Sequence, residues 1–144
     1  MGISCVFEAG TPGCINSIHG HVLGILCDMD AKGEVPITIE SSYMIAHPKE
    51  LDGTCIDILK DYDSKYHSKH VHCRTMKLIM DGIESTRTAT IIEPYDDKTR
   101  GGLFTYEVTL SKLIVKLNNE NIDFHVHTVG ERAVKTVLNA IKLA

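Results

Sequence analysis

The sequence predicts an α/β fold in which four parallel strands alternate with four helices. Two observations support this prediction. Strand-like and helix-like apolar patterns alternate four times along the chain, an order typical of parallel strands joined by crossover helices. The strand segments are also largely apolar, as expected when both faces of a sheet are covered. Four such units make half of an eight-unit (β/α)8 barrel or a small open sheet, and periodicity does not choose between the two.

The first half of the chain contains two strand-helix units. Residues 3–8 predict a short buried strand, and Gly10–Gly13 predicts the turn that follows it. Apolar residues at helical spacing predict a helix over 14–31. Residues 35–44 return to strand character, and a second helix covers part of 49–62.

The second half of the chain repeats this order. Residues 71–81 predict a third strand, and 82–105 form a loop long enough to be functional or disordered. A third helix is predicted over 107–118, followed by a strand over 122–127 and a helix over 131–143.

Composition limits the classes of function. The 43% hydrophobic and 24% charged residues are ordinary for a globular protein. A net charge of -4 argues against nucleic acid as a main partner, because phosphate binding needs a basic surface. No apolar run is long enough to span a membrane and no signal pattern opens the chain, so we expect a cytoplasmic protein. The five scattered cysteines predict reduced, mostly buried thiols.

His127 stands at the carboxyl end of the last predicted strand, where α/β-barrel enzymes place catalytic groups. A neutral imidazole there is a natural metal ligand or acid-base group, and a core histidine bonded to a carbonyl is the alternative. His125 lies on the same strand face, one layer deeper. It is a second ligand or a packing residue, with packing favoured. Glu131, at the start of the last helix, interacts with the helix dipole or, as the second choice, with substrate.

Lys77 lies inside an otherwise apolar strand. Burying a lysine is costly unless the amine is neutralised, paired or modified. We expect it to pair with a carboxylate such as Asp81, or to be carbamylated and so become a carboxylate-like metal ligand. Snorkelling to solvent is the third alternative. Asp81 itself reads as a turn residue whose carboxylate is available on the catalytic face, and Arg87, in the following loop, contacts either substrate or solvent.

Two histidine groups resemble metal sites in content. His19 and His21 fall within a helical pattern, where residues two apart face different ways, so we expect them to pack or to face solvent. The second group consists of His67, His70, His72 and Cys73. Their spacing matches no standard zinc site, so we interpret the segment as a polar loop, with a structural zinc module as the alternative.

Five motifs in order resemble the amidohydrolase superfamily. The branch they resemble most contains exoenzyme-regulatory-like proteins and N-substituted formamide deformylases, within amidohydrolase family 3. The resemblance spans nearly the whole chain and rests on Gly2-Ile-Ser-Cys-Val-Phe-Glu-Ala-Gly10, Met76-Lys-Leu-Ile-Met-Asp-Gly82, Glu84-Ser-Thr-Arg-Thr-Ala89, Glu93-Pro-Tyr95 and His125-Val-His-Thr-Val-Gly-Glu-Arg-Ala133.

This resemblance implies a distorted (β/α)8 barrel with one or two metals, usually zinc, whose bound hydroxide attacks an amide-type C–N bond. It implies that Lys77 is the strand-four lysine, often carboxylated and bridging two metals, and that His127 is the strand-five ligand. Asp81 matches a residue that follows the lysine strand. The family's Gly-Asp-Arg is Gly130-Glu-Arg132 here. The family's first-strand HxH, sixth-strand histidine and eighth-strand aspartate have no counterpart that can be assigned.

The resemblance therefore implies that residues 1–144 are a single partial barrel domain comprising strands two to five. We expect a fragment of a metal-dependent hydrolase acting on non-peptide C–N bonds, inactive by itself. The parent enzyme would use zinc or another divalent metal and a small-molecule substrate, whereas the fragment need not bind metal. Its exposed sheet edges predict a homo-oligomer. The alternative is a non-catalytic binding or regulatory domain derived from the same fold.

Overall fold

A computed structural model describes residues 2–10 and 16–144. Its four strands form one sheet in the order β1-β2-β3-β4, and all neighbouring strands are parallel. The predicted α/β class with parallel strands is therefore confirmed. The strands are β1 (Cys5–Glu8), β2 (Thr38–Met44), β3 (Val71–Ile79) and β4 (Asp123–His127).

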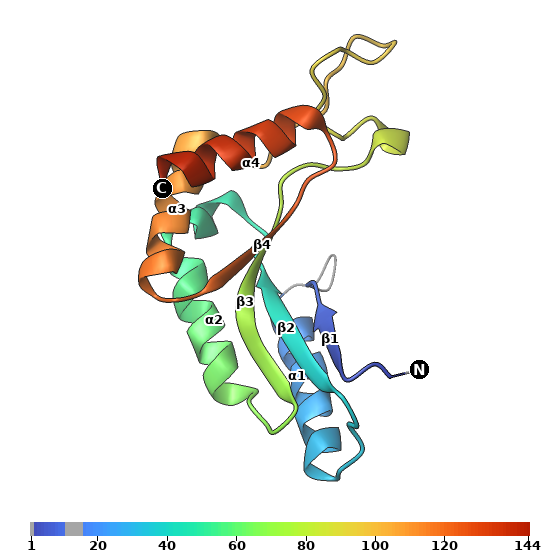
Figure 1. Cartoon of the computed structure of the whole chain (residues 1–144), viewed down its shortest axis with the longest axis vertical. Helices are drawn as coiled ribbons and strands as arrows, with labels where there is room; N and C mark the ends of the chain where they lie inside the picture. The colour runs from blue at the N-terminus through green and yellow to red at the C-terminus, as the bar shows by residue number, and fades with distance from the viewer. Residues whose placement is uncertain (1, 11–15) are drawn as a thin grey trace.

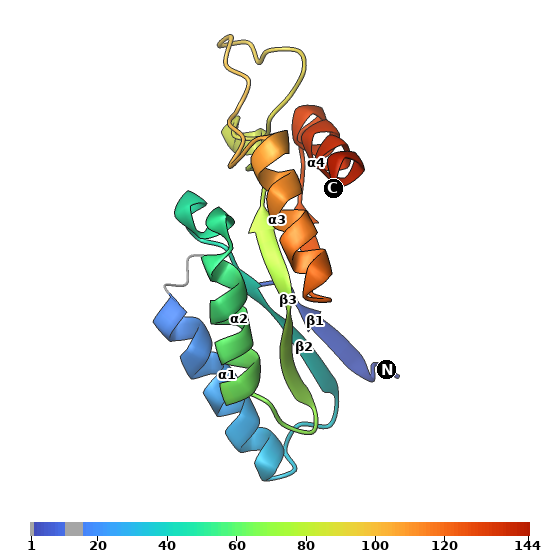
Figure 2. The ribbon, with the colours of Figure 1, turned by 90° about the vertical axis from the view of Figure 1, so that its left-hand side faces the viewer.

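The helices lie mainly on one side of this sheet. Three of them cover the same face: α1 (Asn16–Ala31), α2 (Thr54–Lys65) and α3 (Glu107–Asn119) (Figure 2). The last helix, α4 (Glu131–Leu143), packs against α3 beyond the carboxyl end of β4 (Figure 1). The helices of the described residues thus cover one face of the sheet, and the other face is concave.

The sheet is curled strongly enough to bring its first and last strands into contact across the concave face. The ring of Phe7 in β1 meets the ring of His125 in β4 edge-on, with 5.2 Å between centroids. Because β2 and β3 lie between these strands, only a curled sheet allows this contact. The four strands therefore form a curled half-barrel, in agreement with the half-barrel rather than the flat-sheet alternative.

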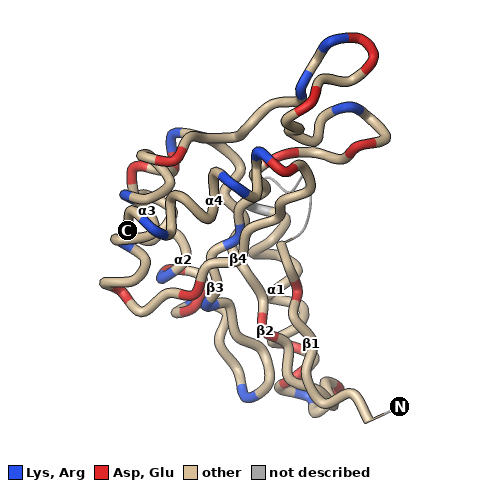
Figure 3. Tube along the Cα trace, turned by 45° about the horizontal axis from the view of Figure 1, so that its top comes forward, with Lys and Arg blue, Asp and Glu red and all other residues tan. Residues whose placement is uncertain are grey.

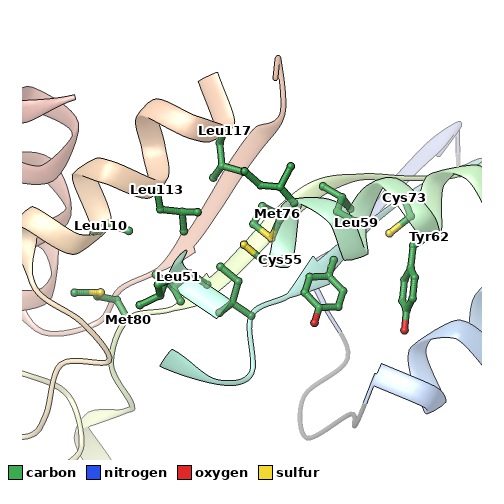
Figure 4. Packing of buried hydrophobic residues seen from close by; sticks show 14 of the residues in the cluster. Leu51, Cys55, Leu59, Tyr62, Cys73, Met76, Met80, Leu110, Leu113 and Leu117 are labelled. Carbon is green, nitrogen blue, oxygen red and sulfur yellow. The ribbon is translucent and has the colours of Figure 1, made fainter. Parts of the chain in front are cut away.

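The hydrophobic core lies between the sheet and its covering helices (Figure 4). Leucines at helical spacing on α3 share one buried cluster with alternate residues of β3 and of the position just after it, because both sets face the same interior. The fully buried members are Leu110, Leu113, Leu117, Met76, Leu78 and Met80. This packing fixes which face of β3 remains for the concave side: the face that carries Lys77 and Ile79.

Most predicted boundaries agree with the structure to within three residues, with one informative exception. The helix expected within 49–62 is split into a 3-10 helix, η1 (Pro48–Asp52), and α2. Gly53 separates them with a φ of 113°, a left-handed conformation that favours glycine. His47 caps η1 by accepting a hydrogen bond from the Lys49 amide. Local capping and one glycine therefore override the continuous helical pattern.

The loop after β3 is ordered by its own hydrogen bonds rather than by regular structure. Apart from the short 3-10 helix η2 (Glu84–Thr86), residues 82–105 contain no helix or strand. The Ile91 amide donates to the Arg100 carbonyl, and the Tyr95 amide donates to that of Thr99. The loop contains both acidic and basic residues (Figure 3).

Two sequence predictions concern residues outside the described ranges. These are the turn ending at Gly13 and the start of the first helix at Cys14. Among the described cysteines all are free thiols: Cys55 and Cys73 are buried, Cys27 is half-buried and Cys5 is exposed. No helix in the described part of the chain has the length and hydropathy needed to cross a membrane.

Candidate functional site

The concave face places Lys77 beside His125. The parallel register pairs Lys77 with His125 and Ile79 with His127. Lys77 Nζ lies 3.3 Å from His125 Nδ1, within hydrogen-bond distance. The predicted pairing of Lys77 with Asp81 does not occur, because the Asp81 carboxylate is occupied by backbone amides. The snorkelling alternative is also wrong, because the Lys77 residue is only 5% exposed.

Gly10, just after β1, packs against the Lys77 side chain, and Phe7 of β1 packs against His125. A side chain at Gly10 would place its Cβ only 3.2 Å from Lys77 Cγ and 3.0 Å from Met44 Cβ, so glycine permits this close approach. Phe7 covers the imidazole of His125. Burial lowers the pKa of Lys77 below its ordinary value. The pKa of His125 is also lowered, first by burial and then by the nearby positive charges of Lys77 and His127.

His127 lies two residues beyond His125 on the same strand and is half-buried. The register thus brings one amine, that of Lys77, and two imidazoles, those of His125 and His127, to one face of the sheet. Residues 2–10 and 16–144 contain no cluster of three or more His, Cys, Asp and Glu side chains able to hold a metal. A catalytic metal site needs about three protein ligands, so Lys77 and the two histidines fit only part of such a site. The metal-ligand roles of Lys77 and His127 stay predictions.

Asp81 joins three segments at the carboxyl end of β3. Its Oδ1 accepts a hydrogen bond from the Val129 amide at 2.9 Å. Its Oδ2 accepts from the amides of Thr90 and Gly130, each at 2.8 Å. The Asp81 residue is 4% exposed. Charge-assisted bonds of this kind hold the long loop and the β4–α4 turn against β3, so the geometry gives Asp81 a positioning role.

Tight backbone packing accompanies the Asp81 contacts. A Cβ added to Gly130 would lie 2.2 Å from the Thr90 carbonyl oxygen, which cannot be accommodated without moving the backbone. That carbonyl accepts a hydrogen bond from the Arg132 amide and so caps the first turn of α4. The glycine turn singled out in the sequence therefore exists because another loop presses against it.

The two residues predicted to contact substrate lie in or next to the long loop. Arg87 forms an exposed ion pair with Asp97 at 2.7 Å. The Glu131 carboxylate accepts a hydrogen bond from the Ile92 amide at 3.4 Å. Both residues therefore have contacts that order the loop. Their predicted roles in binding substrate stay predictions.

His19 and His21 lie on α1, which confirms the predicted helical placement of both. His21 is exposed, whereas His19 is buried against the sheet. His19 Nε2 lies 3.1 Å from Ser41 Oγ, and that hydroxyl donates to the Glu8 carboxylate at 2.6 Å. Burial lowers the pKa of His19, partly offset by the charge of Glu8.

The second histidine group does not converge on one point. His70 Nδ1 contacts Asp30 at 2.6 Å, His67 and His72 pack with 4.8 Å between ring centroids, and Cys73 points into the core. The structural zinc module is therefore not supported by the described geometry. No pattern in the sequence singles out Asp30, which also accepts hydrogen bonds from the Ser68 hydroxyl and the His70 amide. These bonds lower the pKa of Asp30 to about 2.

Two further residues shape the concave face without a clear signal in the sequence. Phe7 and Gly10 belong to the first resemblance motif, but nothing in their local pattern shows that they cover the third and fourth strands. The available signals were weak: an aromatic residue on a short edge strand, and a glycine directly after it. Only the curl of the sheet turns these into site residues.

Comparisons with known proteins agree with this geometry. No protein-family model matches the chain. Over 80 residues, 54% of this chain, the sequence is 36% identical to YtcJ of Bacillus subtilis (strain 168), a protein described provisionally as an amidohydrolase. The matched segment makes up 15% of the length of YtcJ.

Two solved structures share the fold over 96% of this chain. Both are uncharacterized metal-dependent hydrolases, one from Pyrococcus furiosus (TM-score 0.66, 23% identity) and one from Pyrococcus horikoshii OT3 (TM-score 0.65, 18% identity). The chain spans 26% of the length of each. These similarities support the resemblance to the amidohydrolase superfamily and confirm the half-barrel fold.

We predict that Asp81→Asn destabilises the chain by about 1–3 kcal/mol, because the new amide N–H2 group faces backbone donors that lose an acceptor. Chemical denaturation of both proteins measures this loss. Asp96→Asn, at an exposed position in the same loop, removes the same charge and should change stability by less than about 0.5 kcal/mol. Equal effects of the two substitutions would contradict the positioning role of Asp81.

We also predict that acidification destabilises the fold through His19. Its pKa is lower in the folded state than the unfolded value of 6.5, so the unfolded state binds the proton first. Stability therefore falls as pH drops from 6.5 toward the folded-state pKa. The thermal unfolding midpoint should therefore decrease as the pH is lowered from neutral to about pH 5. The decrease should be smaller in His19→Gln. His21→Gln, on the exposed side of α1, should behave like the original chain, and a slope unchanged by His19→Gln would refute this assignment.

Proposed function

We propose that this chain supplies part of the active site of a metal-dependent hydrolase that cleaves non-peptide C–N bonds. The observation that carries the proposal is the buried Lys77, whose amine lies 3.3 Å from His125 on the concave face. Among the described residues, no carboxylate lies within ion-pair distance of this amine. A purely structural role gives little reason to bury a lysine beside an imidazole in this way. The family resemblance and the similarity to YtcJ support the same reaction class.

In this proposal Lys77 acts as a carbamate. Its neutral amine attacks CO2, forming an N–C bond and releasing one proton to solvent, and leaves a side chain that ends in a carboxylate. The lowered pKa of Lys77 favours this step, because only the unprotonated amine is nucleophilic. The carbamate and His127 would be two ligands of a divalent metal, proposed to be zinc. When bound, such a metal lowers the pKa of a coordinated water and so supplies a nucleophile.

The residues around these ligands have separate tasks. His125 accepts or donates a hydrogen bond at the Lys77 amine and holds that side chain in place. Asp81 fixes the turn after β4 by binding the Val129 and Gly130 amides, which orients the end of the strand bearing His127. Gly10 lets the backbone pack against the Lys77 stem, and Phe7 covers the ring of His125. We further propose a substrate of the N-substituted formamide type and a cytoplasmic location, as the family branch and the free thiols suggest.

We predict that 13C-labelled bicarbonate gives a carbamate NMR signal that depends on Lys77. Lys77→Met, which keeps most of the side-chain volume, should remove that signal. Lys98→Met, in the exposed loop, should retain it. Absence of a Lys77-dependent signal at mildly alkaline pH would rule out the carbamate.

Metal analysis of the same variants tests the ligand assignment. Zinc bound by the bicarbonate-loaded chain should be weakened by Lys77→Met and by His127→Ala but not by His21→Ala. Two ligands are too few for a catalytic site, so the 144 residues alone should show no metal-dependent amide hydrolysis. A robust hydrolysis rate from the purified chain would contradict this. Zinc binding unaffected by either variant would favour the binding-domain alternative.

We also propose that the chain associates with copies of itself. In the described sheet β1 and β4 each pair with one neighbour only, and open edges invite pairing. The helices next to these edges expose apolar stripes: Ile18, Val22, Ile25 and Met29 on α1, and Val134, Leu138 and Ile141 on α4. Sedimentation should show dimers or larger species, shifted toward monomer by Leu138→Glu. A well-behaved monomer at working concentration would contradict this proposal.

A further inference from the structure

An open cleft of about 610 Å³ lies outside the concave face. It is bounded by the long loop, the first turn of α3 and the first two turns of α4. Leu103, Tyr106 and Val108 form part of its apolar wall. The cleft shares no lining residue with the Lys77 site, so binding there can be measured separately from the proposed metal chemistry.

Three cationic side chains line this cleft: Arg100, Arg132 and Lys135. None of them has an ion-pair partner within residues 2–10 and 16–144. The Arg100 guanidinium donates a hydrogen bond to the Ile92 carbonyl, which holds it at the cleft. This gathering of unpaired cations is unexpected in a chain with a net charge of -4.

The single carboxylate of the cleft does not neutralise these charges. Glu107 Oε1 accepts a hydrogen bond from Asn139 Nδ2 at 2.7 Å, which engages the carboxylate away from the three cations. Glu107 is also the first residue of α3, and the Tyr106 cap offers no side-chain hydrogen bond to the free amides there. The positive end of the helix dipole therefore adds to the field of the cations.

We propose that this cleft binds a small organic carboxylate with an aromatic or branched apolar body. The forked guanidiniums of Arg100 and Arg132 suit a planar carboxylate, and Lys135 adds a third donor. The apolar body packs against Leu103 and Tyr106. The mixed lining favours such an anion over inorganic phosphate, which would leave the apolar wall in water.

Titration of the 144-residue chain with benzoate, followed by amide chemical shifts, tests this proposal. Saturable shifts are expected at Leu103, Tyr106 and Lys135, whereas benzyl alcohol, which lacks the charge, should not saturate. Arg132→Gln should weaken benzoate binding about tenfold, as the loss of a charge-assisted hydrogen bond predicts. Lys135→Gln removes another cation of the cleft and should also weaken benzoate binding. Because Lys135 is exposed, this substitution carries little risk to folding.

Lys142→Gln on the same helix is the matched control, because Lys142 does not line the cleft. It should leave benzoate affinity unchanged. The proposal is overturned if benzoate does not saturate, if Lys142→Gln weakens binding as much as Lys135→Gln, or if inorganic phosphate binds as tightly as benzoate. None of these outcomes depends on metal binding at Lys77, so the two proposals fail separately.

Discussion

The parallel register of β3 and β4 is the constraint on which the candidate site depends. It sets Lys77 opposite His125 and Ile79 opposite His127. Side chains of paired strands that face the same side lie close together, so the register decides which histidine the lysine meets. A shift of one residue would turn the β4 histidines toward the helices and leave Lys77 without a polar neighbour.

Two further features secure this register. On the helix side, Met76 and Leu78 are buried in the core, where α2 packs on β3, and this prevents β3 from turning over. At the carboxyl end, Asp81 accepts hydrogen bonds from amides 48 and 49 residues further along the chain. A buried carboxylate is stable only when such donors satisfy it. The same group that holds the β4–α4 turn therefore also fixes the end of the strand that carries His127.

Much of the fold could be predicted because each strand-helix unit has its own apolar period. The period-two spacing also placed His125 and His127 together. What could not be predicted depends on pairing between distant segments. No local pattern shows that His125 meets Lys77, that the Asp81 carboxylate meets backbone amides, or that Phe7 reaches across the sheet. Gly53 shows that a single local residue can also override the apolar pattern. Its left-handed conformation divides a helix that the apolar spacing predicts to be continuous.

The most direct test of this account is an NMR titration of the Lys77 side-chain amine, with selective labelling of lysine. The account predicts a midpoint clearly below the ordinary lysine value of 10.5, because the amine is buried beside an imidazole. Replacing Gly10 with alanine, which disturbs the covering turn, should move that midpoint back toward 10.5. A midpoint at the ordinary value in the unchanged chain would show that Lys77 is solvated and would contradict the site described here.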